Sequence, residues 1–482
     1  MSDPKTPDNA GDKAPVKSSG KNTQPSILNI KTIPTNSAMR VDSDVLEPLT
    51  FSQSEAVWEL QPKGFLHPGS SIVIGFDVNA DVSRAFPYAN VGIHSLVRRA
   101  VLRTTAGRVI NDTDDWNSLQ SIRSMFVNNS TNKEREQYLS GRQMSYGVSY
   151  DDKSDVTSTE GLLLDNGMEQ NVIAGDQQGV SVQPVLLNSN QAEFSIKIHD
   201  LFNYCKAGNQ IPLYLLPNER VQIVLYWAQG DTQQDRLAIA KSDDGDTGGA
   251  FVLSRNRCKF IANYTFYDGS IMDKLRDEYA NGLTFSYTDY RLSKQSVNQA
   301  GAVNNVRNIG GNGNVVKSVL WSMADESKDD KNLIGQFNMS APAGLGGAGN
   351  HEVNLLTSNL FINSEFLYPQ SVTNPARQFH NLKEADGMIP HVPRPLYSGQ
   401  GGLSLNNGAR DEFEGRGLST ELGSQFFGQG FRTSGLGTRI DNRGIDLHSS
   451  ATMNAVTYTQ RAWLEIERYV VISDGHLECY FV

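Results

Sequence analysis

The sequence predicts an all-β protein built from two β-sandwiches, and three observations support this fold class. Apolar and polar residues alternate in many short segments, as they do in strands whose two faces meet different surroundings. Helical spacing is confined to a few short stretches. The chain has 482 residues, 38% of them hydrophobic and 43 of them glycine, which indicates two large domains with real cores and many loops.

The first half holds three segments in which every second residue is apolar. Each is expected to be a half-buried strand, because successive side chains of a strand point to opposite faces of its sheet. They are Ser70–Val78, Glu193–Asp200, on which His199 is expected to face solvent, and Glu219–Trp227. The second half repeats the pattern, and its expected strands include Phe260–Phe266, Leu283–Tyr287, Trp463–Ile472 and Leu477–Phe481.

Three short stretches predict helices inserted in loops between strands. One follows the N-cap and acidic residues of Thr113–Asp115, another begins at the N-cap and first-turn pair Asn374-Pro375, and the third has apolar residues four apart. Their apolar stripes are Leu119, Ile122 and Phe126; Phe379 and Leu382; and Ile271, Leu275 and Tyr279. These helices are too few and too irregularly spaced for alternating βαβ units.

Shifts in composition divide the chain into four parts. Residues 1–44 are expected to form a flexible N-terminal arm, because residues 1–26 contain almost no large apolar side chain to offset the entropy of ordering. Residues 45–230 and 250–482 are the two expected sandwich domains. Residues 231–249 are acidic and Gly-rich and show no sustained periodicity, so they are the expected linker.

Charge and cysteine usage exclude several classes of protein. The balance of 43 Lys and Arg against 53 Asp and Glu gives a net charge of −10, which argues against a protein that coats nucleic acid. The three cysteines are far apart and odd in number, which excludes a disulfide framework and fits a reducing compartment. No apolar run approaches the ~18–20 residues of a membrane helix, and no secretory signal is visible.

Several motifs imitate a functional site without the context that such a site needs. Gly344–Gly349 matches the dinucleotide pattern G-x-G-x-x-G, but it precedes an expected strand instead of opening a helix. His94 beside Arg98 and Arg99 is expected to mark a strand edge with surface charges, and the histidines show no metal-ligand spacing. The acidic run Asp243–Asp246 lacks the calcium-loop spacing, so a solvated loop is expected, with weak cation binding left open. The sequence therefore predicts no catalytic residue, no cofactor, no cofactor-binding residue and no metal site.

Polar strands, large loops and the lack of a catalytic constellation indicate a structural or binding protein. One alternative is a receptor-binding or lectin-like β-sandwich, although the sequence has neither a repetitive shaft nor a trimerising coiled coil. Another is a carbohydrate-active β-sandwich enzyme, which needs two carboxylates about 5–10 Å apart in a cleft. Glu465 and Glu467 are candidates for that pair only by position, and surface charges on one strand are the simpler interpretation.

Three stretches of the chain share their order and spacing with one protein family. The first has the pattern G-F-L-x-P-G-S at Gly64–Ser70, then a strand that ends at Arg108–Ile110 and a short helix that carries Trp116. The second is His199–Trp227 and the third is Phe366–Phe379. In these stretches the chain resembles the major capsid proteins of the polinton-like virus and virophage group of double-stranded DNA viruses. The resemblance is weakest over the Gly-rich residues 383–442.

The resemblance implies two eight-stranded jelly rolls in tandem, with short helices in the loops. Three copies would form a homotrimeric capsomer of pseudo-hexagonal outline, and many capsomers would tile an icosahedral shell around double-stranded DNA. The expected location is the virion, after synthesis and assembly inside the host cell. The expected partners are the chain itself, neighbouring capsomers and minor capsid or penton proteins, with no sequence-specific binding of nucleic acid. A minor capsid protein of the same family is the remaining alternative.

The resemblance also places the N-terminal arm at the inner side of the shell. Residues 1–26 carry four Lys and three Asp, and this net charge of +1 is too small for serious DNA binding. The arm is therefore expected to order against neighbouring subunits or minor proteins on assembly, and deleting residues 2–26 should leave trimers intact and impair shell formation. Outer towers or lateral contacts are expected at the Gly- and Asn-rich loops Asn298–Asn314, Ala341–Asn350 and Gly399–Gly437.

Overall fold

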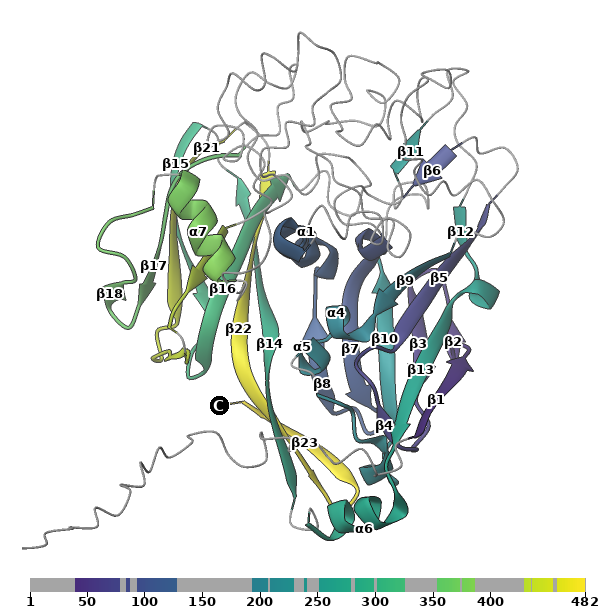
Figure 1. Ribbon diagram of the computed structural model, residues 1–482. Helices are drawn as coiled ribbons and strands as arrows, with labels where there is room; N and C mark the ends of the chain where they lie inside the picture. The colour runs from purple at the N-terminus through teal and green to yellow at the C-terminus, as the bar shows by residue number, and fades with distance from the viewer. Residues whose placement is uncertain are drawn as a thin grey trace, which may run out of the picture.

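The computed structural model places two β-sandwiches side by side, with their strands running roughly parallel to the long axis of the molecule (Figure 1). The first sandwich lies on the right of this view and the second on the left. The structure describes residues 40–78, 84–86, 93–127, 193–206, 209–228, 238–240, 251–278, 282–298, 301–325, 353–372, 375–385, 429–434, 436–453 and 457–481.

The first sandwich contains eight principal antiparallel strands in two sheets. One sheet has the order β1-β13-β5, with β9 pairing the other side of β5, and the other has the order β3-β10-β7-β8. The bounds are β1 (Arg40–Leu46), β3 (Glu55–Glu59), β5 (Ser71–Val78), β7 (Val97–Thr104), β8 (Val109–Thr113), β9 (Glu193–Lys197), β10 (Val221–Trp227) and β13 (Lys259–Phe266).

Shorter elements extend these sheets and cover their ends. The short strands are β2 (Thr50–Phe51), β4 (Phe65–Leu66), β12 (Phe251–Leu253) and the separate pair β6 (Arg84–Phe86) and β11 (Ala238–Ala240). The helices are η1 (Ile93–Leu96), α1 (Trp116–Val127), α4 (Ile198–Leu201), α5 (Asn203–Lys206), η3 (Leu213–Leu215) and η5 (Arg255–Arg257). Helix α6 (Gly269–Glu278) then leads into the second sandwich.

The second sandwich repeats the arrangement with longer strands. One sheet has the order β14-β22-β16-β19 and the other has the order β15-β21-β17-β18. The bounds are β14 (Leu283–Asn298), β15 (Gly301–Gly310), β16 (Val315–Asp325), β17 (Val353–Ile362), β18 (Glu365–Phe366), β19 (Gln429–Arg432), β21 (Ile445–Met453) and β22 (Thr457–Ser473). Two short strands, β20 (Thr438–Arg439) and β23 (His476–Phe481), join the first sheet, and α7 (Pro375–Ala385) packs against β19 and β16.

Both sandwiches have the same strand order. If the eight principal strands of each are counted along the chain, one sheet reads first, eighth, third, sixth and the other reads second, seventh, fourth, fifth. This is the order of a jelly roll, in which two Greek keys are wound into two facing sheets. The prediction of two tandem eight-stranded jelly rolls is therefore confirmed.

The strand pairing corrects two of the expected domain boundaries. Strand β13 lies after the expected linker, yet it pairs with β1 and β5 and is the eighth strand of the first jelly roll. The chain therefore passes from one sandwich to the other through α6, not through residues 231–249. Strand β1 begins at Arg40, so residues 40–44 belong to the first sheet and not to the arm. The expected boundary at residue 230 leaves β10 as the final strand of the first domain, whereas β10 is only the seventh of its eight principal strands and β13 is the eighth.

The predicted positions of the helices agree with the structure better than the predicted domain boundaries do. Helices α1, α6 and α7 lie where the apolar stripes predicted them, and α7 begins at Pro375. His199 is an exception, because the chain turns into α4 at Ile198 and does not continue the strand. The expected loop Asn298–Asn314 is also wrong, since most of it is β15, which pairs with β21. Residues 341–350, 243–246 and most of 399–437 lie outside the described residues.

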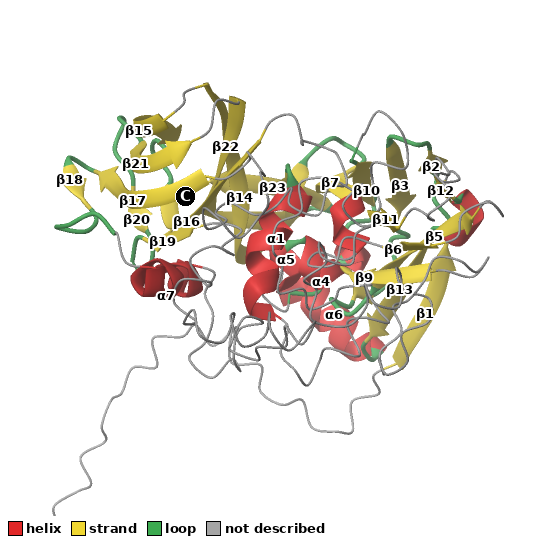
Figure 2. Cartoon of the chain, turned by 90° about the horizontal axis from the view of Figure 1, so that it is seen from above, coloured by secondary structure: helices red, strands yellow, loops and turns green. Residues whose placement is uncertain are grey.

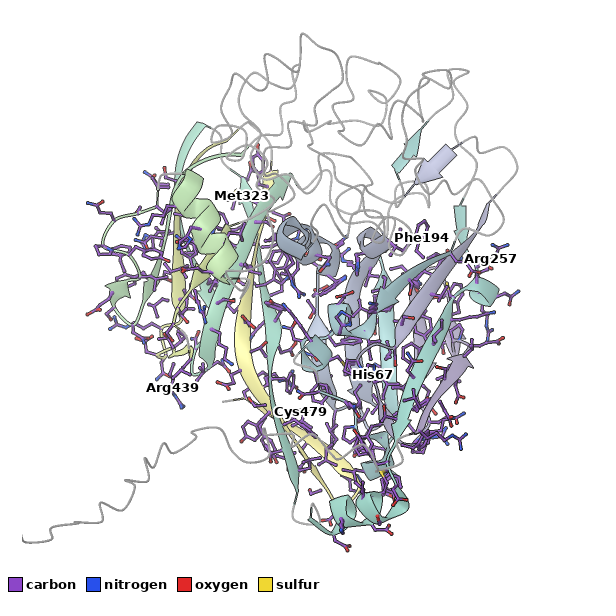
Figure 3. All side chains as sticks on the ribbon, viewed as in Figure 1. His67, Phe194, Arg257, Met323, Arg439 and Cys479 are labelled. Carbon is purple, nitrogen blue, oxygen red and sulfur yellow. The ribbon has the colours of Figure 1, made fainter. Side chains whose placement is uncertain are left out.

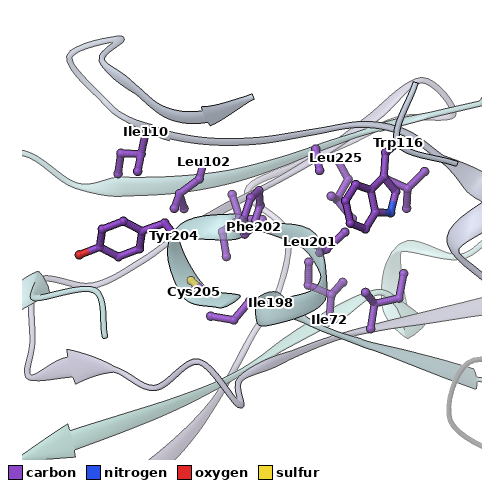
Figure 4. Close-up of a cluster of buried hydrophobic side chains, with 14 of the residues drawn as sticks. Ile72, Leu102, Ile110, Trp116, Ile198, Leu201, Phe202, Tyr204, Cys205 and Leu225 are labelled. Carbon is purple, nitrogen blue, oxygen red and sulfur yellow. The ribbon is translucent and has the colours of Figure 1, made fainter. Parts of the chain in front are cut away.

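A continuous apolar core fills the first sandwich and extends across to the second. Figure 4 shows its centre, where side chains from both sheets and from α1, α4 and α5 meet; the labelled residues are Ile72, Leu102, Ile110, Trp116, Ile198, Leu201, Phe202, Tyr204, Cys205 and Leu225. The same cluster includes residues of β14, β22 and β23, such as Tyr287, Trp463 and Val470. The second sandwich has a further core of its own around Trp321 and Tyr458. Burial of each large side chain contributes about 1.5–3 kcal/mol, so the interface between the sandwiches is part of the folded core.

Three helices lie between the two sandwiches. Seen from above, α1, α4 and α5 lie between the strands of the second sandwich and those of the first (Figure 2).

None of the helices in the described part of the chain is both long and apolar enough to cross a membrane.

Candidate functional site

The motifs that imitate functional sites have structural roles where the structure describes them. His94 is buried beneath α1, where its Nδ1 lies 3.4 Å from the Trp116 Nε1 donor, so the prediction of a strand edge is wrong for this residue. Arg99 donates two hydrogen bonds to Asp112, at 2.7 and 2.6 Å, and Arg98 lies 3.5 Å from Asp115. The motif Gly344–Gly349 lies outside the described residues. Within the described ranges, no three His, Cys, Asp or Glu side chains are grouped as a metal site.

The two glutamates considered for glycoside hydrolysis are held by the strands on either side of them. Glu465 accepts hydrogen bonds from Thr288 on β14 and Ser318 on β16, both at 2.7 Å. Glu467 accepts one from Ser286 at 3.2 Å. Both carboxylates thus crosslink neighbouring strands of a sheet, and the geometry favours this structural role over that of a catalytic pair.

The site that carries the chemistry of this fold is the junction between the two sandwiches. Its lower half is organised around Arg468 of β22. The guanidinium of Arg468 donates to Asp289 of β14 at 2.5 Å and to the carbonyl oxygens of Val109 and Ile110 at 3.1 Å. Tyr287 donates a further hydrogen bond to the Ile110 carbonyl at 2.6 Å. These carbonyls belong to β8, an edge strand, so the second sandwich satisfies acceptors that another strand would otherwise pair.

Asp289 also binds the first sandwich directly. Its Oδ1 accepts a hydrogen bond of 2.9 Å from the Asn111 side chain, and the Asn111 Oδ1 accepts the backbone N–H of Tyr204 at 3.1 Å. Burial raises the pKa of Asp289 to about 6 even though Arg468 and Asn111 act in the opposite direction. The free-energy cost of burying this carboxylate therefore exceeds the stabilisation that Arg468 and Asn111 provide.

The upper half of the junction is centred on a second buried carboxylate, Asp115. It follows β8 and precedes α1, and its backbone has a φ of +47°. Its carboxylate lies 2.5 Å from Arg461, 3.2 Å from Lys294 and 3.5 Å from Arg98. Burial acts to raise the pKa of Asp115, but the three cations outweigh it and hold the pKa below its usual value. The neighbouring Asp114 carbonyl accepts a hydrogen bond of 3.1 Å from the Trp463 indole.

A third set of contacts lies at the hairpin between β22 and β23. Arg108 of the first sandwich donates to the Leu477 carbonyl at 2.5 Å and lies 3.1 Å from Glu219. The Glu219 carboxylate also contacts His476 of the hairpin at 2.8 Å. At the tip, Gly475 has a φ of +76° and packs so close to Pro217 that an added Cβ would lie 3.1 Å from its ring.

Apolar packing fills the space between these polar contacts. The Tyr204 ring of α5 meets the rings of Phe285 and Tyr287 edge-on, with centroids 5.9 and 5.3 Å apart. Burial raises the pKa of both tyrosine hydroxyls. Ion pairs, capped carbonyl groups and aromatic contacts therefore act together to hold the two sandwiches against each other.

A groove of about 1080 Å³ remains open along the junction. Arg99, Arg108 and Asp112 line its first-sandwich side, and residues of β14, β22 and β23 line the other side. Tyr480 and Phe481 at the end of β23 line the groove and are 41% and 58% exposed. Cys479 also lines it and lies between the two sandwiches in Figure 3.

Sequence reasoning missed the junction, although the sequence held a signal for it. Asp289 continues the apolar row of Leu283, Phe285 and Tyr287, and Arg468 falls within the apolar row of β22. Two charges of opposite sign in the apolar phase of two strands predict a buried ion pair, because an unpaired buried charge is too costly. No comparable periodic signal marks Asp115, which lies in a turn.

Comparison with known proteins rests on structure alone, since no family model and no curated protein sequence matches the chain. The capsid protein in a quasi-atomic model of the PBCV-1 virus capsid matches with a TM-score of 0.52 and 10% identity, over 92% of this chain and 97% of that chain. A chain of the Sputnik virophage structure matches with a TM-score of 0.50 and 11% identity, over 95% and 92%. The mavirus major capsid protein gives a TM-score of 0.46 at 10% identity, over 100% and 97%.

The first two matches extend over both sandwiches. Their coverage includes nearly the whole of each chain, so the likeness extends over both sandwiches and is not confined to one. Such neighbours are double-jelly-roll capsid proteins. At about 10% identity the likeness establishes the fold and no more, and the chain has the double-jelly-roll fold of these viral capsid proteins.

Proposed function

We propose that the chain is the major capsid protein of an icosahedral double-stranded DNA virus. One observation carries the proposal: two jelly rolls of identical strand order are locked side by side by a junction of buried ion pairs. Three such chains around an axis present six similar barrels, and six barrels give the six-sided outline that tiles a shell. The likeness in fold to capsid proteins supports the same assignment.

A rigid junction is what this function requires. If the two barrels moved relative to each other, the outline of the trimer would vary and neighbouring capsomers would lose their fit. Proteins of this kind need extensive lateral contacts, because obligate interfaces bury about 2,000 Å² or more. The net charge of −10 implies that other, basic molecules neutralise the packaged genome.

The proposed partners are further copies of this chain, neighbouring capsomers and minor capsid or penton proteins. The proposed location is the capsid shell of a virion assembled inside the host cell. A minor capsid role within the same fold is distinguished by copy number, since a major capsid protein is the most abundant protein of the shell.

Light scattering of the purified chain and electron microscopy test the proposal together. We expect a particle of three times the 53.0 kDa chain mass, with a six-sided outline in projection. A particle that remains monomeric at high concentration, or a trimer with three separated lobes, would contradict the proposed capsomer. Quantitative mass spectrometry of source virions should find this chain as the most abundant shell protein; a low copy number would assign it to a minor role.

A further inference from the structure

The outward face of one sheet of the second sandwich carries a patch of apolar and aromatic side chains. Val306 of β15 lies directly opposite His448 of β21 in the strand register, so both side chains point to the same face of the sheet. The ring of Phe366 lies 5.1 Å from the His448 ring and 5.1 Å from the Phe361 ring, measured between centroids. Val306 and Phe366 are 55% and 50% exposed. We call these four residues the β18 patch.

The first sandwich carries a second patch on its edge strand β1. Val41 and Val45 lie four residues apart on this strand, so they share one face, and they are 56% and 61% exposed. Leu49, which follows the strand, is 60% exposed. Among the described strands β1 pairs with β13 alone, so the backbone groups along its other edge also face outward. We call Val41, Val45 and Leu49 the β1 patch.

These two patches hold most of the large apolar side chains that stay exposed. In the described part of the chain there are eight such side chains, and five of them belong to the patches. Of the other three, Tyr480 and Phe481 line the junction groove and Leu436 lies in a loop. The outward face of an antiparallel sheet is normally polar, and grouped apolar residues on it mark a contact with another molecule.

The two patches lie at opposite ends of the molecule. Strand β1 is at one end and strand β18 at the other, both in the side view and in the view from above (Figures 1 and 2). A single copy therefore cannot bring its own patches together, whereas two copies can if the β1 end of one meets the β18 end of the next. Such a head-to-tail contact uses two different surfaces, and it closes into a ring when the rotation between copies is suitable.

The size of the contact also favours the patches. This step rests on the proposed function, in which three copies place six barrels around an axis. Each barrel then has two neighbours, of which one is the other barrel of its own chain and the second belongs to the next copy. An obligate interface of about 2,000 Å² takes about 1,000 Å² from each partner and is most apolar at its centre, so the free end of each sandwich must supply it.

The charges on β1 do not oppose this contact. Arg40 pairs with Asp42, and Asp44 pairs with Lys63, within the same copy. All three charged residues of the strand thus have a partner before a second copy arrives. Covering the strand would leave no charge of β1 buried and unpaired, which is the arrangement that costs most.

We propose that the β1 patch of one copy packs against the β18 patch of a second copy, and that three such contacts close the capsomer. The partner of each patch is therefore the other patch of a neighbouring, identical chain. Val45 and Val306 are the two residues that test this contact, because each is more than half exposed in the single copy and makes little contribution to its fold.

A charge placed in either patch should weaken the trimer. We expect Val45→Asp and Val306→Asp each to raise the protein concentration at which the trimer dissociates by at least about tenfold, because the contact would bury an unpaired carboxylate. The matched control is Leu436→Asp, which makes a similar change at an exposed apolar residue outside both patches. Mass photometry over a range of concentrations measures the dissociation, and unchanged circular dichroism of the variants shows that the fold is intact.

Crosslinking tests which surfaces meet. In a Cys479→Ser background the remaining cysteines, Cys205 and Cys258, are buried with at most 1% exposure. We expect the double variant Val45→Cys, Val306→Cys to be joined by a short bismaleimide into products of two and three chain masses. Each single variant should stay at one chain mass, because like patches do not meet in a head-to-tail ring.

The results separate this inference from the proposed function. A trimeric wild type whose Val45→Asp and Val306→Asp variants dissociate no more readily than Leu436→Asp would overturn the inference and leave the capsomer in place. A product of two chain masses from the single variant Val45→Cys would overturn it as well, because like patches would then be in contact. A wild type that stays monomeric would contradict the proposed function itself and remove the ring on which the inference rests.

Discussion

The ion pairs of Asp115 predict a large and specific loss of stability when the carboxylate is neutralised. Asp115→Asn is the cleanest perturbation, because asparagine keeps the shape of the side chain and tolerates the positive φ of +47° at this position. The substitution removes the negative charge that faces Arg461, Lys294 and Arg98. It leaves the packing of the junction otherwise unchanged.

The magnitude follows from the burial of the partners. The Arg461 side chain is 3% exposed, and breaking a buried pair by removal of one partner costs about 3–5 kcal/mol. Lys294 and Arg98 are about one third exposed, so solvent screens their attraction to Asp115. Each of these two pairs therefore adds about 1 kcal/mol or less to the loss of stability. The amide oxygen of asparagine can still accept a hydrogen bond from Arg461. We therefore expect Asp115→Asn to lower the free energy of unfolding by about 3 kcal/mol, at the low end of this range. Asp115→Ala should cost about 1 kcal/mol more, since alanine is disfavoured at positive φ.

Urea unfolding followed by tryptophan fluorescence measures this loss, because Trp463 reports directly on the junction. The double variant Asp115→Asn, Arg461→Met should lose less stability than the sum of the two single variants, since it leaves no unpaired buried charge. The matched control is Asp112→Asn, which breaks the more exposed Arg99–Asp112 pair and should cost about 1 kcal/mol or less.

The effect of pH carries a definite sign. The pKa of Asp115 is lowered in the folded protein, so its stabilisation is present above the ordinary carboxylate pKa and is lost as pH falls through the lower folded value. The difference between the wild type and Asp115→Asn should therefore shrink below about pH 4. Equal losses for Asp115→Asn and Asp112→Asn, or strictly additive losses for Asp115→Asn and Arg461→Met, would refute a buried ion pair at this site.

Two further substitutions test other parts of the junction. Burial raises the pKa of Asp289 to about 6, so the folded protein binds an extra proton below this pH. The wild type should therefore gain stability relative to Asp289→Asn as pH falls from about 6 towards 4. Midpoints of urea unfolding that differ by a constant amount across this range would contradict the raised pKa. Gly475→Ala should lower the free energy of unfolding by about 1–2 kcal/mol because of the positive φ at this position. Contacts of the added Cβ with Asn218 and Pro217 should add to this loss. A thermal unfolding midpoint equal to that of the wild type would show that the hairpin does not pack on the first sandwich.

The sequence by itself determined the local structure and the class of fold. Period-two alternation predicted strands at Ser71–Val78, Val221–Trp227 and within Thr457–Ser473, because a strand between core and solvent must alternate its side chains. The apolar stripes of α1 and α7 predicted helices for a similarly local reason. These signals lie within a few residues of one another and do not depend on the rest of the chain.

Only the tertiary structure decided which strands share a sheet and where the sandwiches meet. Alternation shows that β13 is a strand but not that its partners are β1 and β5, so the sequence placed it in the wrong domain. The Asp115–Arg461 hydrogen bond joins residues 346 positions apart, and Asp289 meets Arg468 across 179. The physical reason is that periodicity records which face of an element is apolar, whereas the partner of that face depends on strand register and packing across the whole chain.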